Sequence, residues 1–259
     1  MTKNVSKKFN DSGFYIHKLK NKKAINDATK IILSSNHRSS QSDTLFDKES
    51  LKIQKILYDR KIHIDIFKKE FVDLKKILKI KSLTELMITS FFHLRAVRNV
   101  KSKKNILGFH RETFYSDYEY TSKQINISVP IMNYNKKNSL KVVAKSHLIP
   151  DDKIVVKKLS SKISKIKKNS HKHKLGLSYN PKEIISGVNL LKAKRVKLSV
   201  GQIIIFSSML IHGNGDNNQK KIRYSIDFGI INKKFLRNNK IKKHHISYSK
   251  NKNYWTNLI

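Results

Sequence analysis

The sequence predicts a mainly β protein in which a helical N-terminal region packs on a β-sandwich or β-barrel. Three observations support this fold class. Apolar residues recur at helical spacing in the N-terminal third, short apolar stretches follow one another from Ile106 onward, and residues 124–129 alternate strictly between polar and apolar. Helices followed by a run of short strands are typical of a helical layer on a sandwich or barrel. One such architecture is the jelly roll, a double-sheet barrel that encloses a ligand cavity.

The N-terminal third carries the helical patterns. Its first 20 residues are polar and basic, and we expect them to be irregular in part. Helices are predicted over residues 20–33 and 43–58. The pattern is clearest over residues 64–78, where four apolar residues lie at i, i+4, i+7 and i+11 on one face: Phe67, Phe71, Leu74 and Leu78.

A further helix is predicted from Ser82 to Arg98. Ser82, with Glu85 three residues later, has the spacing of a capping box, and an apolar stripe follows. The two arginines that end the segment, Arg95 and Arg98, fit the basic charge that stabilises a helix C-terminus. The alternative role, contact with an acidic substrate, stays open.

Strand patterns dominate from Ile106 onward. Short strands are predicted over 106–110, 124–132, 139–147, 196–206 (in two parts around Gly201) and 223–231. We interpret residues 1–259 as a single domain. It consists of a helical N-terminal layer over 1–100, a β core over 105–231 with a basic excursion at about 153–195, and a basic tail over 232–259. Within the excursion, residues 157–174 are a low-complexity Lys/Ser stretch, expected to be a surface excursion or a basic helix.

Composition narrows the partners. The chain has 56 Lys+Arg against 18 Asp+Glu, a formal net charge of +38. Such charge can bind nucleic acid, but the Lys residues are spread along the chain, and Lys, Asn and Ile are all abundant, as AT-rich coding sequence would produce. Nucleic acid is therefore not the expected partner, whereas an anionic substrate is favoured by long-range attraction.

The same composition excludes some classes of protein. The sequence has no Cys, which rules out disulfides and thiolate metal sites and fits a cytoplasmic location. The N-terminus shows no apolar signal-peptide core, and no apolar run approaches the roughly 20 residues that span a bilayer. Nothing in the pattern indicates an oligomeric state.

One set of residues has the pattern of a metal site. His110 and Glu112 are two apart after an apolar run, so on an extended segment both side chains point to the same side. A second histidine, His212, also follows an apolar run, and Arg223 opens an alternating strand 11 residues later. Two His and one carboxylate form the facial triad of non-haem Fe(II) oxygenases, and a planar guanidinium suits bidentate binding of a carboxylate.

Three motifs in order resemble the Fe(II)/2-oxoglutarate oxygenases of the phytanoyl-CoA dioxygenase superfamily, most closely its streptomycin-biosynthesis-type and carbohydrate-cluster members. They are F-H-R-E at 109–112, Q-I-N-I-S-V-P at 124–130, and I-H-G-N at 211–214 followed by R-Y-S-I-D-F at 223–228. The resemblance covers about residues 105–231. It departs from the family pattern at Glu112, where Asp is commoner, and at Ser128, where relatives often have an aromatic residue.

The resemblance implies a fold, a cofactor and site residues. The fold is a double-stranded β-helix, another name for the jelly-roll core. His110, Glu112 and His212 would bind Fe(II), while Arg223 and Ser225 would bind the distal carboxylate of 2-oxoglutarate, with O2 as co-substrate. Asn126 matches a position near the cofactor or substrate, and a purely structural role as a buried strand Asn is an equal alternative.

The function expected from this resemblance is a hydroxylase acting on a carbohydrate or a nucleotide-linked sugar, in polysaccharide or secondary-metabolite biosynthesis. Two alternatives remain. One is a non-catalytic basic jelly-roll module that binds polysaccharide or nucleic acid. The other is a metal-dependent isomerase or epimerase on the same scaffold.

Overall fold

The computed structural model describes residues 3–70, 74–75, 77, 80–89, 92–99, 108–114, 119–158, 182–217, 219–236 and 255–258. Its largest element is a seven-stranded antiparallel sheet. In order, this sheet contains β1 (Phe14–Lys18), β9 (Gln202–Ser207), β4 (Ile125–Met132), β11 (Arg223–Asn232), β2 (Leu86–Thr89) and β12 (Trp255–Asn257), and β3 (His93–Val97) also pairs with β11.

Two smaller sheets complete the β structure. A three-stranded antiparallel sheet contains β10 (His212–Gly213), β5 (Lys141–Val142) and β8 (Lys194–Arg195), and β6 (Val155–Lys158) pairs with β7 (Lys182–Ser186). Short 3-10 turns link the strands, at Leu83–Glu85, Glu112–Phe114, Glu119–Lys123, Ser146–Leu148, Asp151–Lys153, Leu190–Lys192 and Lys233–Phe235. The protein is thus mainly antiparallel β, as the sequence predicted.

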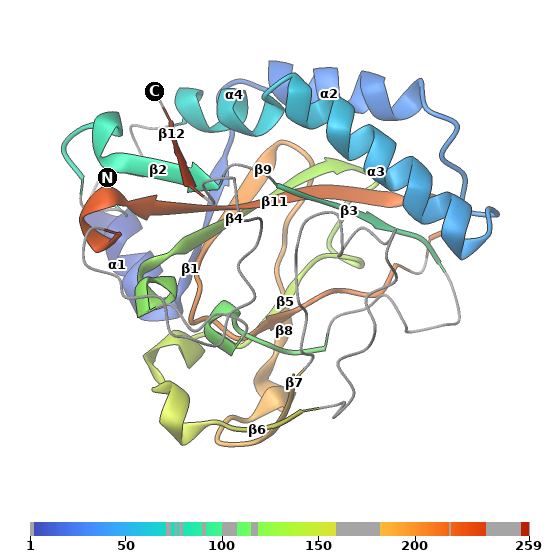
Figure 1. The fold of residues 1–259 in the computed structure, drawn as a ribbon. Helices are drawn as coiled ribbons and strands as arrows, with labels where there is room; N and C mark the ends of the chain where they lie inside the picture. The colour runs from blue at the N-terminus through green and yellow to red at the C-terminus, as the bar shows by residue number, and fades with distance from the viewer. Residues whose placement is uncertain are drawn as a thin grey trace.

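The helices are α1 (Lys3–Ser12), α2 (Lys23–Leu33), α3 (Asp43–Asp59) and α4 (Ile62–Lys69). Figure 1 shows α2, α3 and α4 together on one side of the seven-stranded sheet, with β5 to β8 on the other side. Phe67 and Leu74 of the predicted helical face are buried, whereas Phe71 and Leu78 lie outside the described residues. The helical pattern therefore marks the surface that packs on the sheet.

Strand β4 is buried on both faces, although its polar–apolar alternation predicted a strand with one exposed face. Its apolar residues, such as Ile127 and Val129, belong to the core cluster shared with the helices. Its polar residues, such as Asn126 and Ser128, are also buried, because they face the space between the two sheets. Alternation here separates a helix-facing side from a cavity-facing side.

The helix predicted from Ser82 to Arg98 is wrong. Ser82 and Glu85 do form a capping box, but it starts only the single 3-10 turn that ends at Glu85. The chain then continues as β2 and β3, both paired with β11. Leu86 and Ile88 fit a strand as well as a helix, and burial of both in the sheet decided between them. Arg95 therefore lies on a strand.

The structure also changes the expectations for three further segments. The first 20 residues form α1 and β1, and β1 pairs with β9, so the expectation of irregular structure there is wrong in part. The strand predicted over 139–147 shortens to β5, because the chain turns at Ser146–Leu148. Of the strand predicted over 106–110, the structure describes residues 108–110, where His110 forms an isolated bridge with His212.

The seven-stranded sheet draws strands from all three predicted segments of the chain. Strands β1, β2 and β3 come from the first 100 residues and β12 from the tail. Residues 159–181 of the basic excursion and 237–254 of the tail lie outside the described residues. Among the helices that the structure does describe, none is both long and apolar enough to cross a membrane.

His63 makes protein stability depend on pH. This α4 side chain is 1% exposed, its ring contacts those of Tyr58, Phe92 and Phe228, and burial lowers its pKa to about 4. The unfolded chain therefore binds a proton that the folded chain does not, and the free energy of unfolding falls as pH drops from 6.5 towards 4. The full effect is about 3 kcal/mol.

We expect His63→Phe to remove this part of the pH dependence. Urea unfolding at pH 7 and pH 4.5 measures it, as the difference in the free energy of unfolding between the two pH values. That difference should be smaller in the variant than in wild type, because a phenyl ring occupies the aromatic contacts without titrating. An unchanged difference would assign the acid sensitivity to other groups.

Candidate metal centre

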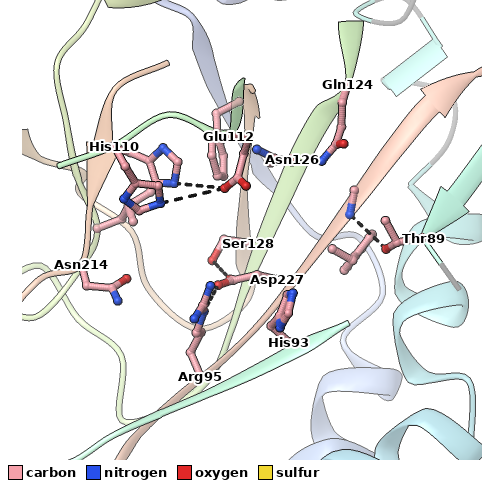
Figure 2. A pocket seen from close by; sticks show the side chains of 15 residues that line it. Thr89, His93, Arg95, His110, Glu112, Gln124, Asn126, Ser128, Asn214 and Asp227 are labelled. Carbon is pink, nitrogen blue, oxygen red and sulfur yellow. Dashed lines mark hydrogen bonds and ion pairs between the residues drawn. The ribbon is translucent and has the colours of Figure 1, made fainter. Parts of the chain in front are cut away.

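Three potential metal ligands converge between the two sheets. One nitrogen of His110, one of His212 and one carboxylate oxygen of Glu112 all lie within 4.8 Å of one another. The Glu112 Oε1 atom is 4.0 Å from His110 Nε2 and 3.7 Å from His212 Nε2. Among the described residues, this is the one group of three or more such side chains placed to hold a metal. Figure 2 shows His110 and Glu112 close together among the residues that line a cavity.

Backbone hydrogen bonds fix this convergence. The amides of His110 and His212 each donate to the other residue's carbonyl, both at 2.9 Å, and the Glu112 amide donates to Ser208 O at 2.9 Å. The two ligand-bearing segments, about 100 residues apart in sequence, are thereby held side by side. The prediction that His110 and Glu112 face the same way was correct. The backbone bridge between His110 and His212 is what brings the third residue of the cluster beside them.

The histidine rings are oriented by a second set of hydrogen bonds. His110 Nδ1 lies 2.8 Å from Gly108 O, and His212 Nδ1 lies 2.9 Å from Leu210 O. A carbonyl oxygen only accepts, so in both rings the proton belongs on Nδ1 and the lone pair of Nε2 points towards Glu112. Backbone carbonyls orient metal-binding histidines in this way in many proteins.

Burial favours the neutral form of His110. It lowers the pKa of this residue well below the usual value, and the neighbouring His212 and the positive charge of Arg95 lower it further. A neutral imidazole is the form that binds a metal ion. The chemistry of this donor set, with two imidazoles and one carboxylate, fits a divalent iron site.

Arg111, between two of these residues, faces the opposite way. It is 0% exposed, and its Nη1 donates to Asp151 Oδ1 at 2.7 Å and to Ile149 O at 2.8 Å, while Nη2 donates to Ser146 O at 2.6 Å. The guanidinium therefore ties the segment that carries His110 and Glu112 to residues 146–151. Sequence reasoning assigned it no role.

The cavity beside the three residues is lined mainly by polar side chains of the seven-stranded sheet. Its walls include Gln124, Asn126 and Ser128 from β4, Asp227 and Gly229 from β11, Thr89 from β2, His93 and Arg95 from β3, and Asn214 beyond β10. In Figure 2, His110 and Glu112 lie across the cavity from Arg95 and Asp227. A polar cavity of this kind suits a hydrophilic ligand.

Asn126 is one of the predicted site residues that lines this cavity. Its Oδ1 accepts a 2.6 Å hydrogen bond from Gln124 Nε2, whereas its buried Nδ2 has no partner among the described residues. An unpaired buried amide costs free energy, so Nδ2 is a donor available to a ligand. The contact with Gln124 is structural, and a role of Asn126 in binding the cofactor or substrate stays a prediction.

Arg223 and Ser225 are not part of the cavity wall. Both are buried on the same side of β11 as Asp227. The Nη1 atom of Arg223 donates to the carbonyls of Asn138 and Gly215, and its guanidinium lies 5.2 Å from the Tyr134 ring centroid. The structure therefore places this arginine outside the cavity lining, against the segments that carry Asn138 and Gly215.

The other edge of Arg223 is open. Its buried Nε has no hydrogen-bond partner, and no carboxylate forms a salt bridge with it in the described part of the chain. Burial lowers the pKa of Arg223 from its usual value, which reflects the cost of burying this charge. Together Nε and Nη2 form a planar fork of the kind that binds a carboxylate. The orphaned Nε is the feature that fits a bound acid.

Gly215 permits the contact with Arg223. A Cβ atom at this position would come within 2.0 Å of Ser139 O and 2.5 Å of Arg195 Nη1. Any larger residue would displace this turn, and with it the carbonyl that Arg223 binds. Gly215 is thus needed because the backbone of residue 139 approaches it closely.

Sequence reasoning assigned neither Arg95 nor Asp227 to the site, although contact with an acidic substrate was the alternative left open for Arg95, and both residues line the cavity. Arg95 was assigned to a helix end, and Asp227 was left out of the site although it lies at even spacing from Arg223. Their connection, between residues 132 apart in sequence, was not visible locally. The even spacing along β11 was the one available signal, because it puts Asp227 on the face that carries Arg223.

Comparison with known proteins shows the fold. No family model matches the chain, and no curated protein matches its sequence. Among solved structures, EvdO2 from Micromonospora carbonacea var. aurantiaca, complexed with 2-oxoglutarate, is similar with a TM-score of 0.60 and 10% identity over 96% of both chains.

Two further structures are similar at comparable levels. The non-haem monooxygenase ThoJ has a TM-score of 0.56 and 14% identity, over 88% of this chain and 77% of that one. The epimerase SnoN, in complex with Fe3+, alpha-ketoglutarate and nogalamycin RO, has a TM-score of 0.53 and 11% identity, over 89% and 83%. The chain therefore has the β-rich, cupin-like fold found in non-haem iron oxygenases and epimerases that use 2-oxoglutarate.

Proposed function

We propose that this protein is an Fe(II)- and 2-oxoglutarate-dependent oxygenase with a jelly-roll core, and that it acts as a hydroxylase. His110, Glu112 and His212 would hold the metal. The observation that carries the proposal is their convergence: two histidines with Nε2 directed at one carboxylate, held by backbone hydrogen bonds at the side of a polar cavity. The similar fold of oxygenases and epimerases of this cofactor class supports it.

The chain offers a place for the keto acid. The open Nε–Nη2 edge of Arg223 would bind the distal carboxylate of 2-oxoglutarate, with Ser225 beside it on the same face of β11. Because Nη1 is already fixed by two carbonyls, the fork is oriented before the acid arrives. Preorganisation of this kind reduces the free-energy cost of binding. Arg223 thus neutralises and orients the acid from the interior of the fold.

When bound, Fe(II) with 2-oxoglutarate and O2 supplies the oxidation of an unactivated C–H bond, with release of succinate and CO2. The residues of this chain would bind the metal and the keto acid and orient them in the cavity. His110, Glu112 and His212 would hold the metal and leave coordination positions free for the keto acid and O2. Asn126 Nδ2, buried and without a partner among the described residues, is placed to donate a hydrogen bond into the cavity.

The substrate that we propose is a carbohydrate or a nucleotide-linked sugar. The cavity wall carries amides and hydroxyls, from Gln124, Asn126, Asn214 and Ser128, which match the hydrogen-bonding groups of a sugar. The net charge of +38 favours an anionic member of this class. Screening 2-oxoglutarate decarboxylation against sugars and sugar nucleotides tests this assignment.

The test of the oxygenase proposal is anaerobic titration of Fe(II)-loaded protein with 2-oxoglutarate. Chelation of Fe(II) by a 2-oxo acid gives a visible charge-transfer band, and we expect one with 1:1 stoichiometry. Succinate production after admission of O2 then reports turnover. A protein that binds Fe(II) at this site but gives neither band nor succinate would not be a 2-oxoglutarate oxygenase.

Epimerisation is the second candidate, because the similar structures include an epimerase, SnoN. Product analysis by mass spectrometry separates the two: hydroxylation adds one oxygen atom to the product, whereas epimerisation leaves its mass unchanged. The non-catalytic binding module is disfavoured by the complete donor set. It would gain support if oligosaccharides or duplex nucleic acid bound tightly and the His110/His212 double alanine variant bound them equally well.

Replacement of Glu112 provides a prediction about the metal. Glu112→Ala removes the one anionic ligand, so we expect the Mn(II) affinity, measured by calorimetry, to fall sharply. Loss of a residue that only supports a metal ligand typically lowers affinity by about 10–100-fold, and loss of a ligand itself should lower it further. Glu112→Asp retains an oxygen ligand on a shorter side chain and should retain part of the affinity.

Glu183→Ala is the matched control, because Glu183 is an exposed carboxylate on β7. It should bind Mn(II) like wild type. If Glu112→Ala binds Mn(II) as well as this control does, Glu112 is not a ligand and another carboxylate must complete the site.

A further inference from the structure

Arg95 presents a second open guanidinium edge, in the wall of the cavity and one strand away from Arg223. Resting on the proposed oxygenase function, we propose that Arg95 binds an oxyanion of the substrate, a carboxylate or a phosphate group, and so selects acidic substrates. The site would then hold two acids at two neighbouring arginines: 2-oxoglutarate at Arg223, which lies outside the cavity lining, and the substrate at Arg95, which is part of that lining. Neither the helix predicted for this segment nor the resemblance assigned Arg95 to the site.

The orientation of Arg95 is fixed through Asp227. Arg95 Nε donates to Asp227 Oδ2 at 3.0 Å, and Ser128 Oγ donates to Asp227 Oδ1 at 2.6 Å. These residues come from three adjacent strands, β3, β11 and β4, whose register places Asp227 opposite both His93 and Ser128. The base of the guanidinium is therefore anchored to the centre of the sheet (Figure 2).

The far end of Arg95 is open. Its one hydrogen bond within the described residues uses Nε, so Nη1 and Nη2 have no protein partner there. Two parallel N–H groups at this end form a fork that matches two oxygens of a carboxylate or phosphate. The residue lines the cavity that also contains His110 and Glu112. A ligand held by this fork would lie beside the metal ligands.

Asp227 is occupied as a positioning residue. Both of its oxygens already accept hydrogen bonds, one from Arg95 and one from Ser128. It is therefore not available as a metal ligand or as a proton acceptor without loss of these bonds. Its carboxylate orients Arg95 and leaves the planar end of the guanidinium directed away from the sheet.

Exposure separates the two arginines. Arg223 is 2% exposed, whereas the Arg95 side chain is 35% exposed. Arg223 is enclosed, so it can accommodate a small acid that binds before the substrate. A larger molecule that enters from solvent meets the half-exposed one first, without having to be buried completely. This difference assigns the cofactor to Arg223 and the substrate oxyanion to Arg95.

The test follows arginine side-chain Nε–H signals by NMR in protein labelled with 15N-arginine. Arg95→Gln and Arg223→Gln assign the two signals by their disappearance, and Arg60→Gln assigns an exposed arginine as the control. Zn(II) replaces iron so that the spectra stay diamagnetic. First 2-oxoglutarate is added, and then inorganic phosphate is titrated into the Zn(II)–2-oxoglutarate complex and, separately, into the metal-free protein.

We expect 2-oxoglutarate to shift the Arg223 signal, and phosphate then to shift the Arg95 signal along a saturating curve. The Arg60 signal should move little and linearly, as for non-specific contact with a positively charged surface. The titrations are performed on the wild-type protein and the variants serve only to assign signals, so a folding defect in a variant does not affect the result.

Two outcomes overturn the inference. In one, phosphate moves the Arg95 signal no more than the Arg60 signal in both titrations. In the other, 2-oxoglutarate itself shifts Arg95 and blocks phosphate, which would make Arg95 the anchor of the cofactor. If 2-oxoglutarate shifts neither arginine, the proposed function fails, and the titration of the metal-free protein still decides whether Arg95 binds an oxyanion.

Discussion

His212→Ala is expected to abolish tight Fe(II) binding. The wild-type protein should bind one Fe(II) per chain, because three donors converge within 4.8 Å and both histidines are oriented through Nδ1 by backbone carbonyls. Loss of His212 removes one of two imidazoles, so the loss of affinity should exceed the roughly 10–100-fold that outer-shell changes cause. Anaerobic calorimetry, or Mn(II) binding followed by electron paramagnetic resonance, measures it.

The matched control is His147→Ala. His147 lies in the 3-10 turn Ser146–Leu148, its Nε2 is 2.8 Å from Asn10 O, and it does not line the cavity. We expect its replacement to leave metal affinity within about twofold of wild type. The double variant His110→Ala/His212→Ala should bind no Fe(II) specifically, and wild-type affinity in this variant would remove the metal centre from the proposal.

Arg223→Gln is expected to weaken 2-oxoglutarate binding far more than it alters metal binding. Loss of one partner of a buried charge-assisted pair typically costs roughly 3–5 kcal/mol, a factor of about 150–5,000 in the dissociation constant. The intensity of the anaerobic charge-transfer band at increasing 2-oxoglutarate concentration gives that constant. Arg223→Lys keeps the charge but lacks the planar fork, so an intermediate loss is expected.

The buried environment of Arg223 requires a control for folding. Its Nη1 holds the carbonyls of Asn138 and Gly215, so replacement also disturbs the turn after β10. Metal affinity and thermal unfolding of each variant report that disturbance, and Arg60→Gln controls for the loss of one positive charge at an exposed position. Equal losses of metal and keto-acid affinity would indicate a folding defect instead of a lost carboxylate contact.

The chemistry of the candidate site could be predicted from residue types and spacing. His110 and Glu112 are close in sequence, and side-chain direction on an extended segment is a local property. His212 and Arg223 lie at the starts of strands, where an apolar run and an alternating run mark the boundaries. These signals need no knowledge of long-range packing, and the structure does bring His110, Glu112 and His212 together. Their role as ligands remains a prediction until metal binding is measured.

The geometry of the anion-binding residues could not be predicted in the same way. Whether the open edge of Arg223 faces inward depends on carbonyls of Asn138 and Gly215, which belong to different turns. Arg95 depends on Asp227, 132 residues away, and on Ser128 in a third strand. Side-chain orientation at such positions is decided by hydrogen-bond partners that are distant in sequence.

By itself, the sequence determined the class of fold, the positions of α2 and α3, the long strands β4 and β11, and the set of side chains available to a metal. Each follows from a periodicity or a short motif that can be read locally along the chain. Only the tertiary structure decided that residues 86–97 form strands, because their apolar pattern fits a helix and a strand alike and pairing with β11 selects one. That choice moved Arg95 from a helix end to the cavity wall, since a strand in this sheet directs alternate side chains between the two sheets.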